Sequence, residues 1–376
     1  MNLKPVLGVL LFSAVAWAQL EVIATGLQGP QKMVLTPAGN LLISESSTAI
    51  NSGRLSLVTS GGVRRTLLDK LPSGVEVTGG GSGPTALAIR ERTLYVALGG
   101  GDVERRAERP GTVMHNPQGP SSPLFASVLK VVANQDLDML AGPFEMTVAH
   151  QRVLHDGGDV QIADATGGTL TVSVLARFPV SEPDANTVYR FSNPWGFALT
   201  ADGNTLYTTD ASVNALVSID TTTGRWQRLM RFAPSPNPGN VGPPVIEAVP
   251  TGVRVYGNQV LVSFLSGFPF YPGFARVLAV NPVTRTAEPF INGLTSAVDV
   301  AVGPSGSARP SFFALEFSVN QSAQPAAPGR LLRFDTPEAQ VVAADLRAPV
   351  SLAYDSSANL LYVLELTGRV LRLRVQ

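Results

Sequence analysis

The chain has 376 residues, no cysteine and a formal net charge of zero, with 44% hydrophobic and only 15% charged residues. The missing cysteines exclude disulfide bonds and thiol catalysis, and a chain of this length buries a large core without them. Zero net charge without a cluster of Lys and Arg argues against a nucleic-acid partner, which needs a basic surface. The 36 glycines and 29 prolines indicate many turns between short strands.

The N-terminus has the pattern of a secretory signal peptide rather than of a buried helix or strand. Lys4 precedes an apolar stretch from Val6 to Val15, and Ala16-Trp17-Ala18 forms an A-x-A cleavage site. We therefore expect residues 1–18 to be removed and the mature chain 19–376 to be secreted or periplasmic. No later segment is apolar for the ~18 residues that a membrane span requires.

Six segments repeat one pattern: an alternating apolar run, a turn rich in Gly, Asp, Asn or Ser, and a second apolar run. This pattern predicts a β-hairpin. The six hairpins occupy residues 29–46, 83–100, 193–210, 249–266, 296–317 and 348–366.

Two further strands follow most hairpins. They are predicted over Gly53–Thr59 and Val63–Leu71 in the first unit, and over Ala215–Asp220 and Arg225–Phe232 in the third. Four antiparallel strands in about 50 residues are typical of a propeller blade. The all-β alternative, a pair of sandwiches, does not require the same hairpin six times. The sequence therefore predicts a single six-bladed β-propeller.

The last unit contains only three strands before the chain ends. One more strand is predicted near the mature N-terminus, over Leu20–Leu27. We expect it to complete the last blade and close the ring, because closure removes exposed edge strands. The second and third hairpins are about twice as far apart as the others. We interpret this spacing as a long insertion around 101–190 rather than a seventh, degenerate blade.

The predicted loops differ in length between the two faces of the propeller. With strands A to D counted outward from the channel, the A–B and C–D turns are short. Long loops occur in the B–C and D–A connections, at 71–83, 99–123, 233–249, 265–275 and 318–329. These connections all leave the same face, and loops on a rigid scaffold commonly carry function. We call it the long-loop face.

Strand B ends at this face, and four of its six final residues are acidic. In chain order the six are Glu45, Leu98, Asp210, Phe264, Glu316 and Glu365. Asn193 and, slightly deeper, Asp299 begin inner strands at the same end. These oxygens are candidates for binding a ligand, Ca²⁺ or another divalent cation, or for acid–base chemistry. The alternative is structural, since a carboxylate at a strand end also binds backbone N–H groups.

An aromatic group lies in the 265–275 loop of the same face. Phe268, Phe270 and Tyr271 follow one another there with only Pro269 between them. They are candidates for the wall of a ligand site, and packing over the edge of a blade is the alternative.

Three segments together resemble a known family. They are SNPWGFALTADGNTLYTTDASVNALVSID, VPTGVRVYGNQVLVSFLSGFPFYPGFARVLAVNP and LTSAVDVAVGPSG with its continuation FFALEF. They resemble the exported propellers of the scytonemin-biosynthesis (ScyD/ScyE) type, and the 101–190 region departs from that pattern in places. The resemblance implies an exported six-bladed propeller, linked in some members to an indolic extracellular pigment.

The hairpins are also similar, more loosely, to NHL-repeat and gluconolactonase-type propellers. That likeness implies a divalent cation held in the channel mouth by Glu45, Asn193 and either Asp299 or Asp210.

Three functions follow from these observations. The first is binding, with or without conversion, of a small molecule at the channel mouth. The second is an NHL-type scaffold that binds a protein through the long loops. The third is a cation-dependent lactonase or hydrolase. An enzyme predicts a concave mouth with convergent carboxylates of altered acidity, whereas a scaffold predicts carboxylates bonded to backbone amides.

Overall fold

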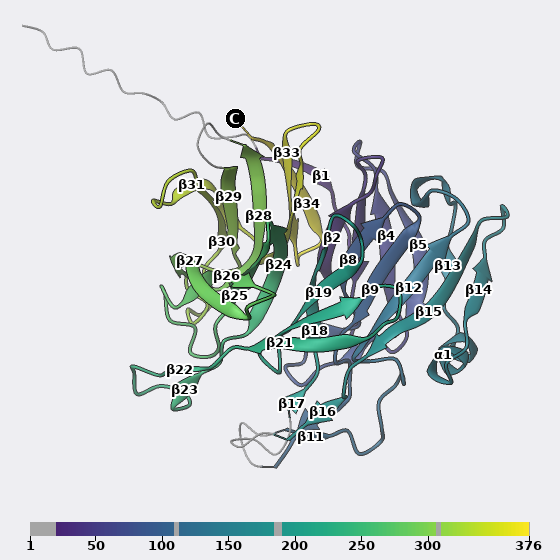
Figure 1. Ribbon diagram of the computed structural model, residues 1–376, viewed down its shortest axis with the longest axis horizontal. Helices are drawn as coiled ribbons and strands as arrows, with labels where there is room; N and C mark the ends of the chain where they lie inside the picture. Colours follow the sequence, from purple (N-terminus) through teal and green to yellow (C-terminus); the bar gives the residue numbers. More distant parts are fainter. Residues whose placement is uncertain (1–19, 109–112, 184–189, 306–309, 376) are drawn as a thin grey trace, which may run out of the picture.

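The computed structural model describes residues 20–108, 113–183, 190–305 and 310–375. The predicted signal peptide lies outside these ranges. Six antiparallel sheets are arranged in a ring, so the predicted six-bladed propeller is confirmed (Figure 1). The inner strand of each blade contacts the inner strands of both neighbouring blades, which closes the ring around a central axis.

Each blade begins with its inner strand at the axis and continues outward. Blade 1 consists of β2 (Pro30–Leu35), β3 (Leu41–Glu45), β4 (Gly53–Val58) and β5 (Arg64–Leu71). Blade 2 consists of β8 (Pro84–Arg90), β9 (Thr93–Leu98), β12 (Ser127–Ala133), β15 (Thr169–Arg177) and β14 (Val160–Ala163). Blade 3 consists of β18 (Pro194–Leu199), β19 (Thr205–Asp210), β20 (Ala215–Asp220) and β21 (Trp226–Arg231).

The other three blades follow in chain order. Blade 4 consists of β24 (Pro250–Tyr256), β25 (Gln259–Phe264), β26 (Ala275–Asn281) and β27 (Thr286–Leu294). Blade 5 consists of β28 (Ala297–Ser305), β29 (Pro310–Glu316), β30 (Gly329–Phe334) and β31 (Gln340–Leu346). Blade 6 consists of β32 (Pro349–Asp355), β33 (Leu360–Glu365), β34 (Arg369–Arg374) and β1 (Glu21–Ala24).

The N-terminal strand closes the ring, as predicted. β1 pairs antiparallel with β34, with Val22 opposite Leu371. Ala24 and Leu27 are buried in the apolar cluster shared by blades 6 and 1. The strand therefore covers the edge that β34 would otherwise expose.

The turns between inner strands depend on local chemistry. In blade 3 the Asp202 side chain accepts a hydrogen bond from the backbone N–H of Asn204 at 3.1 Å. Gly203 adopts a φ of +76°, which glycine reaches without a steric cost. The Ala-Asp-Gly-Asn stretch therefore sets the short β18–β19 turn.

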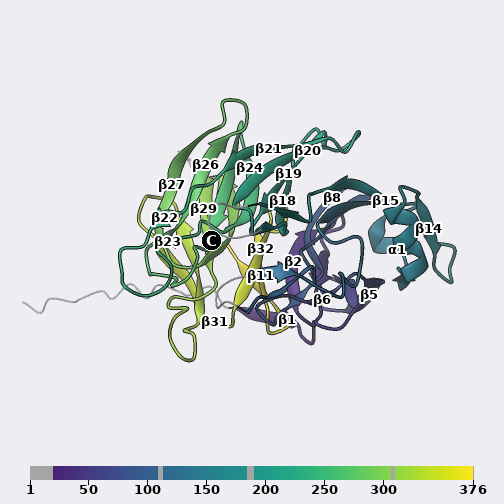
Figure 2. The same cartoon turned by 90° about the horizontal axis from the view of Figure 1, so that it is seen from below.

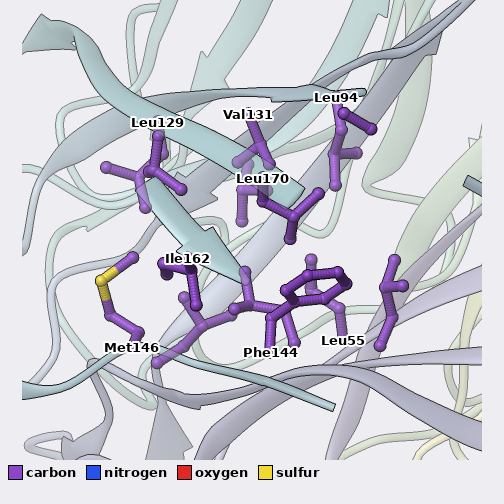
Figure 3. Close-up of a cluster of buried hydrophobic side chains, with 14 of the residues drawn as sticks. Leu55, Leu94, Leu129, Val131, Phe144, Met146, Ile162 and Leu170 are labelled. Carbon is purple, nitrogen blue, oxygen red and sulfur yellow. The ribbon is translucent and has the colours of Figure 1, made fainter. Parts of the chain in front are cut away.

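The region 101–190, interpreted above as an insertion, contains two regular strands of blade 2, β12 and β15, and an added segment lies between them. It contains η1 (Leu137–Met139), β13 (Phe144–Glu145) and α1 (Val148–His155). β13 pairs with β5 of blade 1, and β14 extends blade 2. Phe144, Met146 and Ile162 lie in one cluster with Leu55 and other side chains of both blades (Figure 3). The insertion therefore joins the outer strands of two blades.

Across the described residues, no helix has the length and apolar character needed to cross a membrane.

Candidate functional site: the long-loop face

Four small hairpins rise from the long-loop face. They are β6–β7 (Gly74–Val75 and Gly81–Ser82), β10–β11 (Glu104–Arg106 and Val113–His115), β16–β17 (Ser181–Glu182 and Arg190–Phe191) and β22–β23 (Ser235–Pro236 and Val245–Ile246). The last three lie on the lower side of the ring in Figure 1, and Figure 2 looks at this side. The loops predicted to be long therefore build one elaborated face. The expectation of short C–D turns is wrong for blade 2, whose C–D connection at residues 134–168 is long and starts from the opposite face.

The structure places all six predicted strand-B ends at equivalent positions. Each is the last residue of the second strand and faces the first residue of the inner strand. That first residue is a proline in five blades, and a β-bulge follows it in all six. The pairs are Pro30–Glu45, Pro84–Leu98, Pro194–Asp210, Pro250–Phe264, Ala297–Glu316 and Pro349–Glu365.

The four carboxylates at these ends are buried, with exposed fractions of 0 to 3%. Each accepts a hydrogen bond from a backbone N–H of the loop that enters its own blade. The donors are Gln28 for Glu45 (2.5 Å), Asn193 for Asp210 (2.9 Å), Thr295 for Glu316 (2.6 Å) and Arg347 for Glu365 (2.7 Å). The carboxylates therefore hold the loop entrances, which is the structural role considered for them.

Each of these carboxylates also has a side-chain partner. Arg369 Nε donates to Glu365 at 2.5 Å, and Arg330 Nε donates to Glu316. The hydroxyls of Ser56 and Ser192 donate to Glu45 and Asp210, respectively. Within the described ranges, no group of three or more His, Asp or Glu side chains lies close enough to hold a metal ion.

Asp210 differs from Glu316 and Glu365, each of which forms an ion pair with an arginine of its own blade, because its side-chain hydrogen bond comes from Ser192. Burial raises the pKa of Asp210, and it outweighs the opposing hydrogen bonds from Ser192, Asn193 and Val213 and the charge of Arg228. The pKa therefore lies above the usual value for an aspartate, although the side chain makes three hydrogen bonds.

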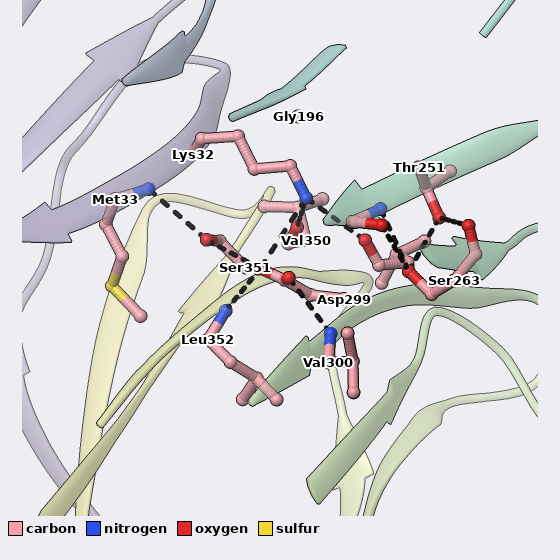
Figure 4. A network of polar contacts seen from close by, with 12 residues as sticks. Lys32, Met33, Gly196, Thr251, Ser263, Asp299, Val300, Val350, Ser351 and Leu352 are labelled. Carbon is pink, nitrogen blue, oxygen red and sulfur yellow. Dashed lines mark hydrogen bonds and ion pairs between the residues drawn. The ribbon is translucent and has the colours of Figure 1, made fainter. Parts of the chain in front are cut away.

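Asp299 lies deeper, between the inner strands, with two cations beside it. Arg254 Nη2 lies 3.1 Å from Asp299 Oδ1, and Lys32 Nζ lies 3.6 Å from Asp299 Oδ2. Lys32 also donates to the backbone oxygens of Val298 and Val350 at 3.0 Å each (Figure 4). Side chains from blades 1, 4 and 5 therefore meet where the inner strands converge. We call Lys32, Arg254 and Asp299 the axial cluster.

The charges of the axial cluster perturb one another. Burial lowers the pKa of Lys32, and Asp299 only partly offsets this effect. Burial also acts to raise the pKa of Asp299, but Arg254, Lys32 and two backbone N–H groups outweigh it and leave this pKa below its usual value. Asp299 is therefore ionised and paired at neutral pH.

The donor set implied for a divalent cation does not fit one in this arrangement. Both carboxylate oxygens of Asp299 already face Arg254, and a cation would have to displace that guanidinium. Asn193 Oδ1 accepts the backbone N–H of Gly100 at 3.1 Å, and Glu45 is bonded as described above. A metal role for Glu45, Asn193 and Asp299 stays a prediction.

The aromatic loop is held by both of its neighbours. The hydroxyl of Ser322 in blade 5 donates to Pro269 O at 2.5 Å, and Gly267 N donates to Glu247 O at 2.8 Å. Phe268 is 50% exposed and contacts Phe270 edge to face, whereas Phe270 and Tyr271 are half-buried. The loop therefore presents one large aromatic side chain to solvent in a fixed position.

Sequence reasoning missed Lys32 and the pair Glu76 and Glu104. Lys32 had a signal, because it is the single charged residue of the inner strand β2, in which Gln31 is the other polar residue. Burial raises the pKa of Glu104 to about 7, and the charge of Glu76 adds to this effect. These two residues come from separate loops, at β6 and β10, so only the fold shows their proximity.

Comparison with known proteins supports the propeller fold but assigns no function to this chain. No protein-family model matches the sequence, and no curated protein matches it. A protein of unknown function from Bacteroides thetaiotaomicron matches with a TM-score of 0.50 and 10% identity, over 95% of this chain and 76% of that one.

Two enzymes are similar at about the same level. A streptogramin B lyase matches with a TM-score of 0.48 and 11% identity, over 96% of this chain and 100% of that one. A gluconolactonase from Xanthomonas campestris matches with a TM-score of 0.49 and 10% identity, over 96% and 93%. At these identities the likeness concerns the propeller fold, which hosts many activities.

Proposed function

We propose that the protein is a binding propeller that recognises a partner protein with its long-loop face. The observation that carries this proposal is a ring of exposed apolar side chains on that face. Eight of them follow one another around the blades: Ile50, Val75, Met114, Val180, Val241, Phe268, Val319 and Leu366. On the opposite face the short turns expose Val63 and Val283, and the C–D connection of blade 2 exposes Met139, Val148 and Val153.

The breadth of this ring favours a macromolecule. Exposed apolar residues scattered singly are ordinary, but eight on one face, contributed by loops of all six blades, suit an extended interface. The loops of a rigid scaffold also bind with little loss of conformational freedom.

The state of the carboxylates favours binding over catalysis. A general acid or base must reach its substrate. Glu45, Asp210, Glu316 and Glu365 are instead buried and bonded to backbone N–H groups. This is the arrangement expected of a scaffold.

Site-directed photo-crosslinking tests the proposal. A photoreactive amino acid is placed at Val241 or Val319 on the long-loop face, and at Val283 on the opposite face as a matched control. We expect both loop positions to crosslink the same protein in the native extract, and Val283 not to crosslink it. Similar products from both faces would contradict the proposal, and so would crosslinks only between copies of this chain.

A small molecule at the channel mouth is the second candidate, and Trp195 favours it. Trp195 is the second residue of the inner strand β18, yet it remains partly exposed. Because Trp195 lies at the end of β18 that opens onto the long-loop face, we infer that it is accessible near the channel mouth. In a Trp226→Phe variant, a change in Trp195 fluorescence on adding an indolic compound or a lactone would support this candidate.

We also propose that the protein is exported, on the strength of the pattern in residues 1–18. N-terminal sequencing of the protein from its native host tests this, and we expect the mature chain to begin at Gln19. An intact N-terminus would contradict it.

Two finer assignments stay predictions. The role in forming an indolic pigment depends on the sequence resemblance and needs a binding test with such compounds. The divalent cation needs a measurement of metal content by mass spectrometry. Because Arg254 pairs with Asp299, we expect no stoichiometric metal and no change of melting temperature on chelation. A stoichiometric metal lost on substitution of Glu45 would restore the metal assignment.

A further inference from the structure

Four blades carry an arginine opposite the last residue of strand B. The pairs are Arg54 with Glu45, Arg276 with Phe264, Arg330 with Glu316 and Arg369 with Glu365. The arginine stands at the start of the third strand in each of these blades. The four positions are equivalent by the repeat, so their partners can be compared directly.

Three of these arginines face a carboxylate of their own blade. Arg330 and Arg369 donate from Nε to Glu316 and Glu365. Arg54 Nε lies 4.0 Å from Asp69 on the neighbouring strand β5. The repeat therefore normally supplies this cation with an anion.

Blade 4 breaks this rule, because Phe264 occupies the place of the glutamate. The guanidinium of Arg276 lies over the Phe264 ring, 5.6 Å from its centroid. Arg276 forms no hydrogen bond or ion pair with any described residue, and its Nε is buried without a partner. The two Nη atoms also lack partners but are not buried, so a ligand can reach them.

The carboxylate in the loop that enters blade 4 already binds other residues. Glu247 lies in the loop that enters blade 4, and its oxygens bind Arg190 at 2.8 and 3.1 Å and also accept from Asn214. Glu247 is therefore not the missing partner of Arg276.

A buried donor without an acceptor is costly, and a partly desolvated guanidinium forms strong hydrogen bonds with an anion. The ring of Phe264 supplies apolar surface directly at the guanidinium. The fixed loop 265–274 immediately precedes β26 in the chain and carries the exposed Phe268.

We propose that Arg276 binds a carboxylate of the partner protein. In blades 5 and 6 a glutamate of the same blade, Glu316 or Glu365, fills the equivalent place. The carboxylate meets the Nη edge, and the adjoining apolar group lies against Phe268. A carboxylate suits the site better than a phosphate, since one arginine offers few donors for a dianion and the equivalent sites hold carboxylates. The inference rests on the proposed function, because it assigns one contact on the proposed binding face.

The test uses two probes that differ only at the anionic group, N-acetyl-phenylalanine and its amide, in NMR titrations of the full protein. We expect the acid to bind at least tenfold more tightly than the amide. Inorganic phosphate serves as a third probe, and a capped peptide with an internal Glu separates a side-chain carboxylate from a terminal one. Equal binding of acid and amide, or tighter binding of phosphate, would overturn the proposal.

Four variants test whether Arg276 is the residue that binds the carboxylate. Arg276→Gln removes the cation, and Phe264→Glu provides an internal carboxylate; we expect each to weaken binding of the acid at least tenfold. Phe264→Leu removes the ring without adding a charge and should keep the preference for the acid. Arg330→Gln, the matched control in blade 5, should lower the melting temperature but leave probe binding unchanged.

Unchanged binding by Arg276→Gln would overturn the inference even if the Phe264→Glu variant failed to fold. The photo-crosslinking experiment is independent of these probes. If a partner protein is crosslinked but the acid probe does not bind, the proposed function is supported and only the assignment of Arg276 is wrong.

Discussion

Polar side chains near the propeller axis form hydrogen bonds between neighbouring blades. Ser44 Oγ donates to Thr85 O in the next blade at 2.5 Å, and Thr251 Oγ1 donates to Ala297 O at 2.9 Å. These four residues are all buried. Polar residues near the axis therefore satisfy backbone groups that the ring closure removes from water.

We predict that the anion of the axial cluster, Asp299, is needed for stability. Asp299→Asn would leave Lys32 and Arg254 without their shared anion in a buried site. Removing one partner of a buried ion pair costs about 3–5 kcal/mol, so we expect a loss of that size in the free energy of unfolding. Urea denaturation measures it.

The control for this variant is Asp136→Asn. Asp136 forms an exposed ion pair with Arg92, with N–O at 3.0 Å. Exposed pairs contribute at most about 1 kcal/mol, so this variant should unfold almost as the parent protein does. Equal losses from both substitutions would show that Asp299 is not a structural anion.

At the scale of elements, the strand that closes the ring contributes to stability, whereas the long loops form the proposed binding face. β1 is short, and two of its four residues are exposed, yet it pairs with the middle of β34 at the outer edge of blade 6. Its contribution therefore comes mainly from hydrogen bonds with β34 and from the burial of Ala24.

Removing β1 tests the closure. We expect a chain that begins at Thr25 to unfold with about 2–4 kcal/mol less free energy than one that begins at Leu20, through lost hydrogen bonds and burial. The exposed edge of β34 should also promote aggregation, visible as light scattering. Identical stability and solubility of the two chains would contradict the role of β1.

The loop carboxylates Glu76 and Glu104 predict a pH dependence. The folded-state pKa of Glu104 is about 7, above its ordinary value of 4.5. Its contribution to stability is therefore present below pH 4.5 and is lost as the pH rises through 7. We expect the melting temperature of Glu104→Gln, relative to the parent protein, to increase between about pH 5 and pH 8.

A Glu76→Gln variant is the matched test of the cause. It removes the neighbouring charge but leaves the burial, so the pKa of Glu104 should fall and yet remain above its ordinary value. NMR titration of the Glu104 carboxyl measures this directly. An unchanged pKa would show that burial alone accounts for the shift.

At the scale of the whole molecule, the insertion makes the ring uneven. Blades 1 and 2 share an apolar cluster that includes Leu55 of β4, Leu170 of β15 and Phe144 of the insertion (Figure 3). The other four blades lack such an outer link among the described residues. We therefore expect the first two blades to unfold as one cooperative unit.

Phe144 is the residue that tests this link. It is fully buried, and replacing a buried phenylalanine with alanine costs about 3–5 kcal/mol. We expect Phe144→Ala to lose stability in that range by urea denaturation. Met139→Ala, at a side chain that is 73% exposed, should change it by less than about 0.5 kcal/mol. Similar small effects of both would show that the insertion is not part of the core.

Several features of this protein could be read from its sequence alone. Strand periodicity and turn residues are local, so the hairpins, the six blades and the closing strand were all predicted. β20 was predicted with its observed bounds, and β4 and β5 within one residue at one end. The acidic strand ends were also recognised, because their place in the repeat is periodic.

The tertiary structure alone decided which side chains meet. Lys32, Arg254 and Asp299 are far apart in the chain, and only ring closure brings their charges together. The backbone N–H groups that occupy the four carboxylates come from the same blade, so strand pairing within the blade brings them together. The missing partner of Arg276 is evident only beside the equivalent blades. Local pattern determines an element, whereas the pairing of charges depends on distances that the assembled ring sets.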